Sequence, residues 1–157
     1  MERKDMDARK YLEQVMELKK EVKSRAEHLN RMRALADGFP GFCPDNSKVQ
    51  AGLNTDDVPN RLIRKWEAEM VLDEAIDELA DTMEEIRETI RQTGKQQIRD
   101  VLEKRYLDLM EWDQIGEAMM LTKDRIWQIH REGLMAVQEI LEGRGDETHD
   151  IYGSGGT

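Results

Sequence analysis

Cysteine, proline, aromatic residues and long apolar runs are all scarce in this chain of 157 residues. The single cysteine, Cys43, excludes an intramolecular disulfide and a zinc site with four cysteine ligands. The histidines, at positions 28, 130 and 149, show no metal-ligand spacing, so we predict no metal site. Aromatic residues make up 5% of the chain and charged residues 37%, which favours long solvated helices over a thick core.

The chain also lacks an apolar run of about 18 residues, and its charged start, MERKDMDARK, does not resemble a secretory signal. These absences predict a cytoplasmic protein that does not contact a membrane. Nothing resembles a phosphate-binding loop, a catalytic triad or a working pair of carboxylates. We therefore expect no enzymatic activity and no cofactor.

The net charge of −10 argues against tight, non-specific coating of DNA, because affinity for phosphates depends on Lys and Arg. The charge is uneven along the chain. Within residues 122–131, Lys123, Arg125 and Arg131 outnumber Asp124, so this segment is locally positive. The sequence is thus compatible with weak, locally steered DNA binding.

The three prolines, at positions 40, 44 and 59, lie in one stretch and leave uninterrupted runs on both sides. Residues 5–37 have the heptad spacing of a coiled coil and predict a first long helix. Its two apolar columns are Ala8, Val15, Val22, Leu29 and Ala36, and Tyr11, Leu18 and Met32. Residues 38–58 are rich in Gly, Pro, Asn and Asp and predict a loop.

A second long helix is predicted over residues 58–93. Its apolar stripe consists of Leu62, Trp66, Ile76, Leu79, Met83, Ile86 and Ile90. Two long helices joined by one loop predict an antiparallel hairpin over residues 1–94, which would offer a surface for a partner. We interpret the acids between Glu67 and Glu78 as a solvated helix face.

Shorter helical patterns follow Gly94, at Gln96–Leu109, Trp112–Met119 and Lys123 to about Glu142. We predict an all-α chain in which a helix-turn-helix domain over residues 95–142 follows the hairpin. The polar residues 143–157 predict a disordered tail.

The segment from Trp112 to Leu134 predicts two short helices around a tight turn, with Thr122 capping the second. If Ile126 and Ile129 face inward, helical geometry places the following side chains outward, with Arg125 at the flank: Lys123, Asp124, Trp127, Gln128 and Arg131. Arg and Lys suit guanine, and Gln suits adenine, in the major groove. By composition alone, an ordinary amphipathic helix explains these residues equally well.

Residues 101–137, VLEKRYLDLMEWDQIGEAMMLTKDRIWQIHREGLMAV, resemble the helix-turn-helix of region four of bacterial sigma factors. The matching positions are Arg105, Tyr106, Trp112, Ile115, Met119, Thr122, Ile126 and His130 to Leu134. The chain resembles phage and prophage sigma-like proteins, of the superfamily of ArpU-type late transcription regulators, more closely still. Their long helical hairpin often carries a motif that Ser47-Lys48-Val49-Gln50 matches.

The resemblance implies a transcription regulator of a bacterial host's nucleoid that binds double-stranded DNA. It also implies that the hairpin contacts RNA polymerase or a second copy of the chain. The implied DNA-binding residues are Thr122, Lys123, Arg125, Trp127, Gln128 and Arg131. Two alternatives stay open: an adaptor that binds polymerase or another regulator without touching DNA, and a structural coiled-coil protein.

Three residues depart from the family pattern. Gly116 stands where the family has alanine, Met120 where the turn usually has glycine, and Gln128 where related sequences often carry a second arginine. If the turn requires positive φ, methionine is strained there. We interpret His130 as a packed, hydrogen-bonded residue. We interpret the tryptophans Trp66, Trp112 and Trp127 mostly as core or edge residues, with Trp127 facing outward.

Overall fold

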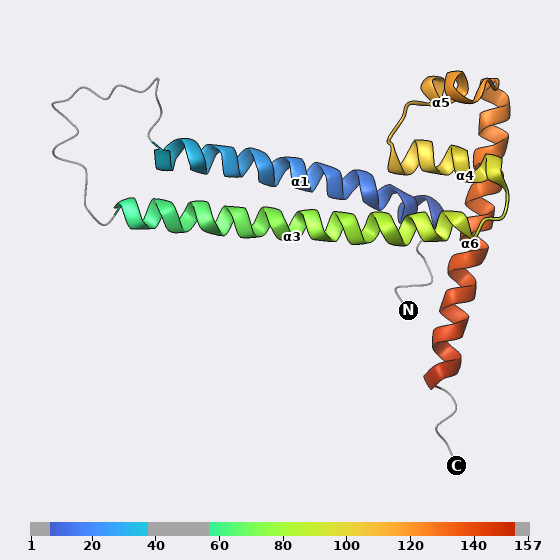
Figure 1. Cartoon of the computed structure of the whole chain (residues 1–157). Coiled ribbons are helices and arrows are strands. Elements are labelled where there is room, and N and C mark those ends of the chain that lie inside the picture. The colour runs from blue at the N-terminus through green and yellow to red at the C-terminus, as the bar shows by residue number, and fades with distance from the viewer. Residues whose placement is uncertain (1–6, 38–56, 153–157) are drawn as a thin grey trace, which may run out of the picture. The chain divides into compact units, whose positions relative to one another are not determined.

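The chain is all-α, as predicted: the computed structural model describes residues 7–37 and 57–152, and these contain no strand (Figure 1). The elements in chain order are α1 (Ala8–Asp37), α3 (Asp57–Arg91), α4 (Gln96–Leu102), the π-helical turn η1 (Glu103–Leu107), α5 (Trp112–Met119) and α6 (Lys123–Tyr152). The loop predicted over residues 38–58 and the Ser47–Gln50 motif lie outside the described residues, except that residues 57 and 58 already belong to α3.

The chain divides into two compact units. One unit is Leu18–Ala80, called here the two-helix unit; the other, the multi-helix unit, comprises Met1–Glu17 and Asp81–Thr157. This division differs from the boundary predicted near residue 94. The difference arises because the first turns of α1 bond both to the last turns of α3 and to α6.

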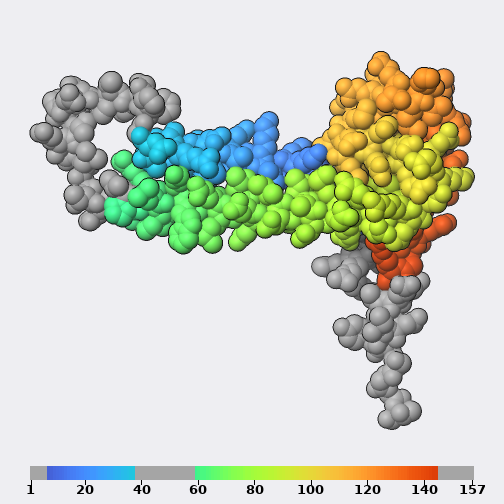
Figure 2. Space-filling view, viewed as in Figure 1, coloured from blue at the N-terminus to red at the C-terminus, as the bar shows by residue number. Residues whose placement is uncertain are grey.

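In the two-helix unit, α1 and α3 lie side by side and run antiparallel (Figures 1 and 2). Leu29 of α1 is buried, as are the small side chains Ala68 and Ala75 of α3. An exposed ion pair crosses between the helices, with Arg33 Nη2 3.6 Å from Glu69 Oε1. Because each helix has only one neighbour among the described residues of this unit, its core is a single thin seam.

Only part of the apolar stripe predicted for α3 is buried in the core. Ile86 and Ile90 are buried, but Leu62, Ile76 and Trp66 are exposed, the last at 63%. Of the two positions expected for Trp66, core or edge, the described structure therefore excludes the core. The reason is that α1 covers one face of α3, and the two alanines occupy that face where the helices meet.

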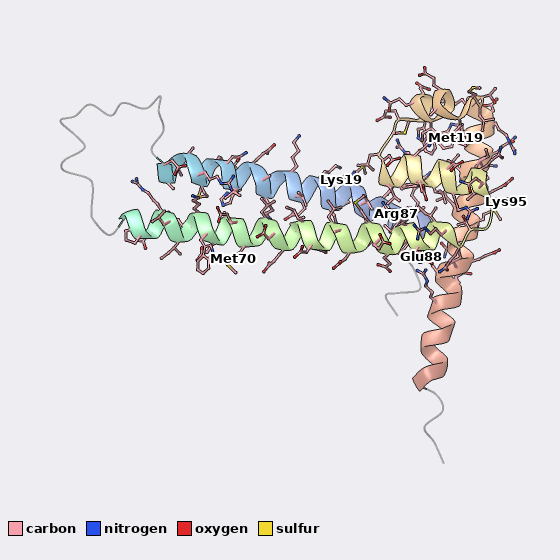
Figure 3. The ribbon with its side chains drawn as sticks, viewed as in Figure 1. Lys19, Met70, Arg87, Glu88, Lys95 and Met119 are labelled. Carbon is pink, nitrogen blue, oxygen red and sulfur yellow. The ribbon has the colours of Figure 1, made fainter. Side chains whose placement is uncertain are left out.

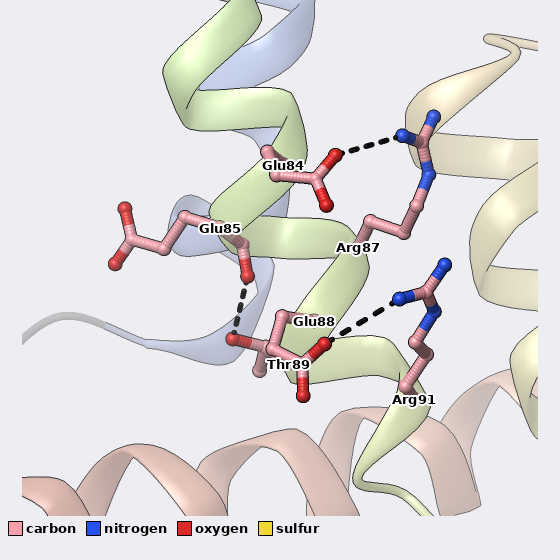
Figure 4. Close-up of polar contacts among 6 residues, drawn as sticks. All are labelled: Glu84, Glu85, Arg87, Glu88, Thr89 and Arg91. Carbon is pink, nitrogen blue, oxygen red and sulfur yellow. Dashed lines mark hydrogen bonds and ion pairs between the residues drawn. The ribbon is translucent and has the colours of Figure 1, made fainter.

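Within the multi-helix unit, a buried hydrogen bond connects α1 to α3. Tyr11 Oη of α1 lies 2.9 Å from Thr89 Oγ1 of α3, and Thr89 Oγ1 donates to the carbonyl oxygen of Glu85 at 3.0 Å (Figure 4). The backbone N–H of Ala8 donates to Gln138 Oε1 of α6 at 2.9 Å. These bonds satisfy polar groups that would otherwise be costly to bury, and they attach α1 to both α3 and α6.

The same close-up shows two exposed ion pairs on α3. Arg87 Nη1 lies 3.1 Å from Glu84 Oε2, and Arg91 Nη1 lies 3.6 Å from Glu88 Oε2. Each joins residues three positions apart on one helix, so each adds only a few tenths of a kcal/mol, on the order of 0.2–0.5, to helix stability.

Close packing of α4 against α6 depends on Gly133. A β-carbon at this position would lie 3.2 Å from a methyl carbon of Ile98 and 3.2 Å from both methyl carbons of Leu102. Ile98 and Leu102 are buried, as are the other members of this core, Val101, Ile115, Ile126, Ile129 and Val137. Glycine thus permits the approach that closes the core.

Helix α6 continues to Tyr152, beyond the predicted end near Glu142. The disordered tail predicted for residues 143–157 is thus corrected over residues 143–152, and residues 153–157 lie outside the described structure. A helical glycine costs about 1 kcal/mol relative to alanine, which weakens a helix without necessarily ending it. Gly143 accordingly lies within α6, and a β-carbon there would meet no atom within 4 Å.

Candidate nucleic-acid interface

Arg105 fixes the linker that leads into α5. In η1 the backbone N–H of Asp108 donates to the carbonyl oxygen of Glu103 at 2.9 Å, which widens the helix by one residue. Arg105 Nη1 then donates to the carbonyl oxygen of Met110 at 2.9 Å, and its guanidinium lies 4.7 Å from the ring centre of Trp112. This cation–π contact orients the first residue of α5.

The turn between α5 and α6 is left-handed at a methionine. Met120 has φ 55° and ψ 41°, and its side chain is 85% exposed. The N–H of Leu121 donates to the carbonyl oxygen of Gly116 at 3.0 Å. Glycine adopts this conformation without a steric penalty and methionine does not, so the turn is strained at Met120. The sequence predicted this strain on the condition that the turn requires a positive φ.

The second departure has a local explanation. A β-carbon at Gly116 would lie 3.2 Å from the backbone oxygen of Leu121, which is tighter than an ordinary van der Waals contact. Glycine at this position therefore fits a turn that folds closely back on α5. Glycine thus allows the turn to approach α5 closely, but it costs up to about 1 kcal/mol of helix propensity relative to alanine.

Thr122 caps α6 as predicted. Its Oγ1 accepts from the backbone N–H of Arg125 at 3.3 Å, and its carbonyl oxygen accepts from the N–H of Ile126 at 3.0 Å. Ile126 and Ile129 are buried. The side chains predicted to face outward are exposed, namely Lys123, Asp124, Trp127, Gln128 and Arg131, as is the flanking Arg125. The orientation of this helix is thus confirmed, while the role of these residues in DNA binding stays a prediction.

His130 is buried behind the outward face and is neutral near pH 7. Its Nε2 and Tyr106 Oη share a 2.6 Å hydrogen bond, which confirms the interpretation of a packed, hydrogen-bonded histidine. Burial lowers the pKa of the imidazole to about 4, with further lowering by the positive charges of Arg9 and Arg105. Burial also raises the pKa of the Tyr106 hydroxyl.

Two tryptophans stack beside this histidine. The ring centres of Trp112 and Trp127 are 4.7 Å apart with an interplanar angle of 27°, and Trp112 meets the edge of His130 at 4.7 Å. Trp112 is half-buried, in agreement with its predicted packing role, whereas Trp127 is 40% exposed. The stack covers one face of Trp127 and leaves part of its indole open to solvent.

The exposed charges of the interface are partly paired. Lys123 Nζ lies 3.8 Å from Asp113 Oδ1, and Arg125 Nη1 donates to Gln128 Oε1 at 3.3 Å. Asp124 adds a negative charge beside them. Exposed pairs of this kind contribute little stability, so these cations can exchange their present partners for phosphate or base oxygens at little cost.

Sequence reasoning did not identify two features of the site. The hydrogen bond between Tyr106 and His130 joins residues on different elements, and the only signal in the sequence was that both residues lie within residues 101–137. Leu109, with φ 55°, is a second left-handed residue that no glycine or asparagine marks. Both features lie behind the outward face of α6 or in the linker before α5, and neither belongs to the exposed surface of the interface.

Among residues 7–37 and 57–152, the structure shows no cluster of three or more His, Cys, Asp or Glu side chains placed to hold a metal ion. None of the helices found there is both long and apolar enough to cross a membrane. Comparison with protein-family models, with curated proteins and with solved structures finds no match.

Proposed function

We propose that this chain is a sequence-specific, DNA-binding transcription regulator of phage or prophage type that reads the major groove with the first turns of α6. The observation that carries the proposal is the row of exposed Lys, Arg, Gln and Trp side chains on α6, backed by the buried Ile126 and Ile129. A capped helix with a rigid inner face presents these side chains in a fixed pattern, which sequence reading requires.

Each residue has a chemical role in this proposal. Arg125 and Arg131 donate to guanine or to phosphate, Gln128 pairs with adenine, and the Thr122 hydroxyl binds a phosphate oxygen. Trp127 supplies an apolar surface for a thymine methyl group. Lys123 adds positive charge once it leaves Asp113.

The same residues set the expected strength of binding. The net charge of −10 and the nearby acids oppose the approach of DNA, so the isolated chain should bind weakly and with strong dependence on salt. Tight binding then requires a partner, either RNA polymerase or a second copy engaged through the long helices α1 and α3. If the proposal holds, the protein acts at the nucleoid of a bacterial host, as the sequence resemblance implies.

The proposal is tested with duplex DNA from the region upstream of the protein's own gene. The variant Arg125→Ala/Arg131→Ala is compared with Lys23→Ala/Arg31→Ala, which removes the same charge at exposed positions of α1 in the two-helix unit. The slope of log K against log salt should fall in magnitude by up to about 2 for the first variant, because each lost phosphate contact releases one counterion fewer.

The control variant should keep most of the wild-type slope. Equal loss in both variants would mean that binding depends on overall charge, and the absence of binding by the wild-type chain at low salt would remove the proposal altogether. A binding defect confined to the first variant supports recognition through α6.

A second candidate function is an adaptor that binds RNA polymerase or another regulator without contacting DNA. The acids around the interface, including Asp113 and Asp124, favour this candidate. Co-purification with polymerase from nuclease-treated lysate, together with no measurable affinity for DNA, would distinguish it. The third candidate function is a structural coiled-coil protein. A stable oligomer in sedimentation, with no affinity for either DNA or polymerase, would support it.

A further inference from the structure

The outer face of α3 in the two-helix unit carries four large apolar side chains exposed to solvent. Leu62, Ile63, Trp66 and Met70 form this group, called here the α3 stripe, with exposed fractions of 53%, 49%, 63% and 48%. Spacings of three and four residues place them on one side of the helix. A group this large and contiguous on an otherwise charged helix indicates an interaction surface.

The α3 stripe lies almost opposite the face that α1 covers. At 100° per residue, Trp66 is separated from Ala68 by about 200° and from Ala75 by about 180° around the helix. Both alanines are buried, whereas Trp66 is the most exposed member of the stripe. Figure 3 shows Met70 on the side of α3 that points away from α1.

We propose that the α3 stripe is the contact surface for a second copy of this chain, whose α3 packs antiparallel against the first with Trp66 near the centre. This inference gives residues to the second-copy contact that the proposed function invokes. Its evidence comes only from the two-helix unit, so it can fail while DNA binding holds, and the reverse. A twofold pairing uses the same surface on both copies, so an apolar stripe on one copy meets the same stripe on the other.

The charges of α3 favour the antiparallel direction. From Asp57 to Trp66 the helix has three basic residues and one acid, and from Glu67 to Ala80 it has six acids and no base. A parallel pair would place the six acids of one copy beside those of the other. An antiparallel pair instead places the basic segment of each copy beside the acidic segment of the other, so the charges are complementary.

The register identifies one ionic pair across the interface. With Trp66 at the centre, Leu62 of one copy lies level with Met70 of the other. Lys65 then lies within about 3 Å, along the helix axis, of Glu69 on the same flank of the opposite copy. Glu69 already contacts Arg33 at 3.6 Å, but that pair is solvent-exposed and weak, so Glu69 stays available to Lys65.

The size of the surface sets the expected affinity. Four half-exposed apolar side chains present about 400 Å² per copy. Two copies would thus cover about 800 Å², with flanking polar area added, and stable interfaces bury about 1,200–2,000 Å². We therefore expect a reversible dimer of micromolar affinity. Binding of two copies to neighbouring DNA sites would strengthen it.

Sedimentation equilibrium of the full chain, without DNA, tests the pairing. Trp66→Ala should weaken dimerisation at least tenfold, whereas Met135→Ala, which truncates an equally exposed side chain on α6, should leave it within twofold. Circular dichroism checks that both variants keep wild-type helix content.

Charge reversal tests the direction of pairing. Lys65→Glu and Glu69→Lys should each weaken self-association, and an equimolar mixture of the two should restore it, because only the mixed dimer pairs opposite charges at both sites. A chain that stays monomeric at all concentrations, or a dimer that Trp66→Ala leaves intact, overturns the proposal. Failure of the mixture to restore pairing overturns the antiparallel register.

Discussion

Replacing Met120 with glycine should stabilise the protein, although most substitutions of a native residue destabilise. Met120 has φ 55° and ψ 41°, a conformation that costs a residue with a β-carbon roughly 1–2 kcal/mol and costs glycine almost nothing. Glycine also gives the unfolded chain more freedom, which removes roughly 0.4–1 kcal/mol of the gain. Since the methionine side chain is 85% exposed, little burial is lost, and we expect a net gain of about 0.5–1 kcal/mol.

The assay is urea unfolding followed by tryptophan fluorescence, because Trp112 and Trp127 lie in the same unit as the turn. The midpoint should rise while the dependence on urea stays constant. Met135→Gly is the matched control: this exposed methionine lies inside α6, where glycine should cost about 1 kcal/mol. If both substitutions destabilise equally, the turn is not left-handed at Met120 and the reasoning fails.

Three further substitutions test residues of α6. His130→Gln should reduce the loss of stability on acidification. The folded-state pKa of about 4 lies below the unfolded value of 6.5, so the stabilisation from the neutral imidazole is complete above pH 6.5 and falls by at most about 3 kcal/mol as the pH falls to 4. Gly133→Val should destabilise by about 1–3 kcal/mol, because its side chain would press on Ile98 and Leu102. Gly143→Ala, in open space on the same helix, should stabilise by up to about 1 kcal/mol.

Unfolding curves between pH 4 and pH 7 check the first of these, with His28→Gln as the control at an exposed histidine. Parallel pH profiles for wild type and His130→Gln would show that the imidazole is not desolvated. For the glycines, equal effects at the two positions would mean that α4 does not approach α6 as closely as described.

Helical periodicity predicted the fold class and the inward and outward faces of α6. A repeat of three to four residues depends on local geometry alone, so it placed Ile126 and Ile129 inside and Trp127 outside correctly. The capping role of Thr122 was equally predictable, because a hydroxyl just before a helix accepts a hydrogen bond from a backbone N–H of the first turn.

The same periodicity could not say which apolar faces find a partner. Trp66 fits the stripe of α3 as well as Ile86 does, yet only Ile86 is buried. Burial depends on the number of neighbouring helices, which the pattern within one helix does not contain. Likewise, Gly143 reduces helix propensity by a known amount, but the extent of α6 depends on the sum over many residues.

The stacked pair of Trp112 and Trp127 gives the molecule an optical signal of its own. Two indoles 4.7 Å apart and tilted by 27° couple their electronic transitions, so the far-ultraviolet circular dichroism should contain a paired exciton band beside the helical bands. The outer indole belongs to the surface that would meet DNA or a protein partner. Any occupant that shifts Trp127 relative to Trp112 would therefore alter this band, and occupancy could be followed on the unlabelled chain.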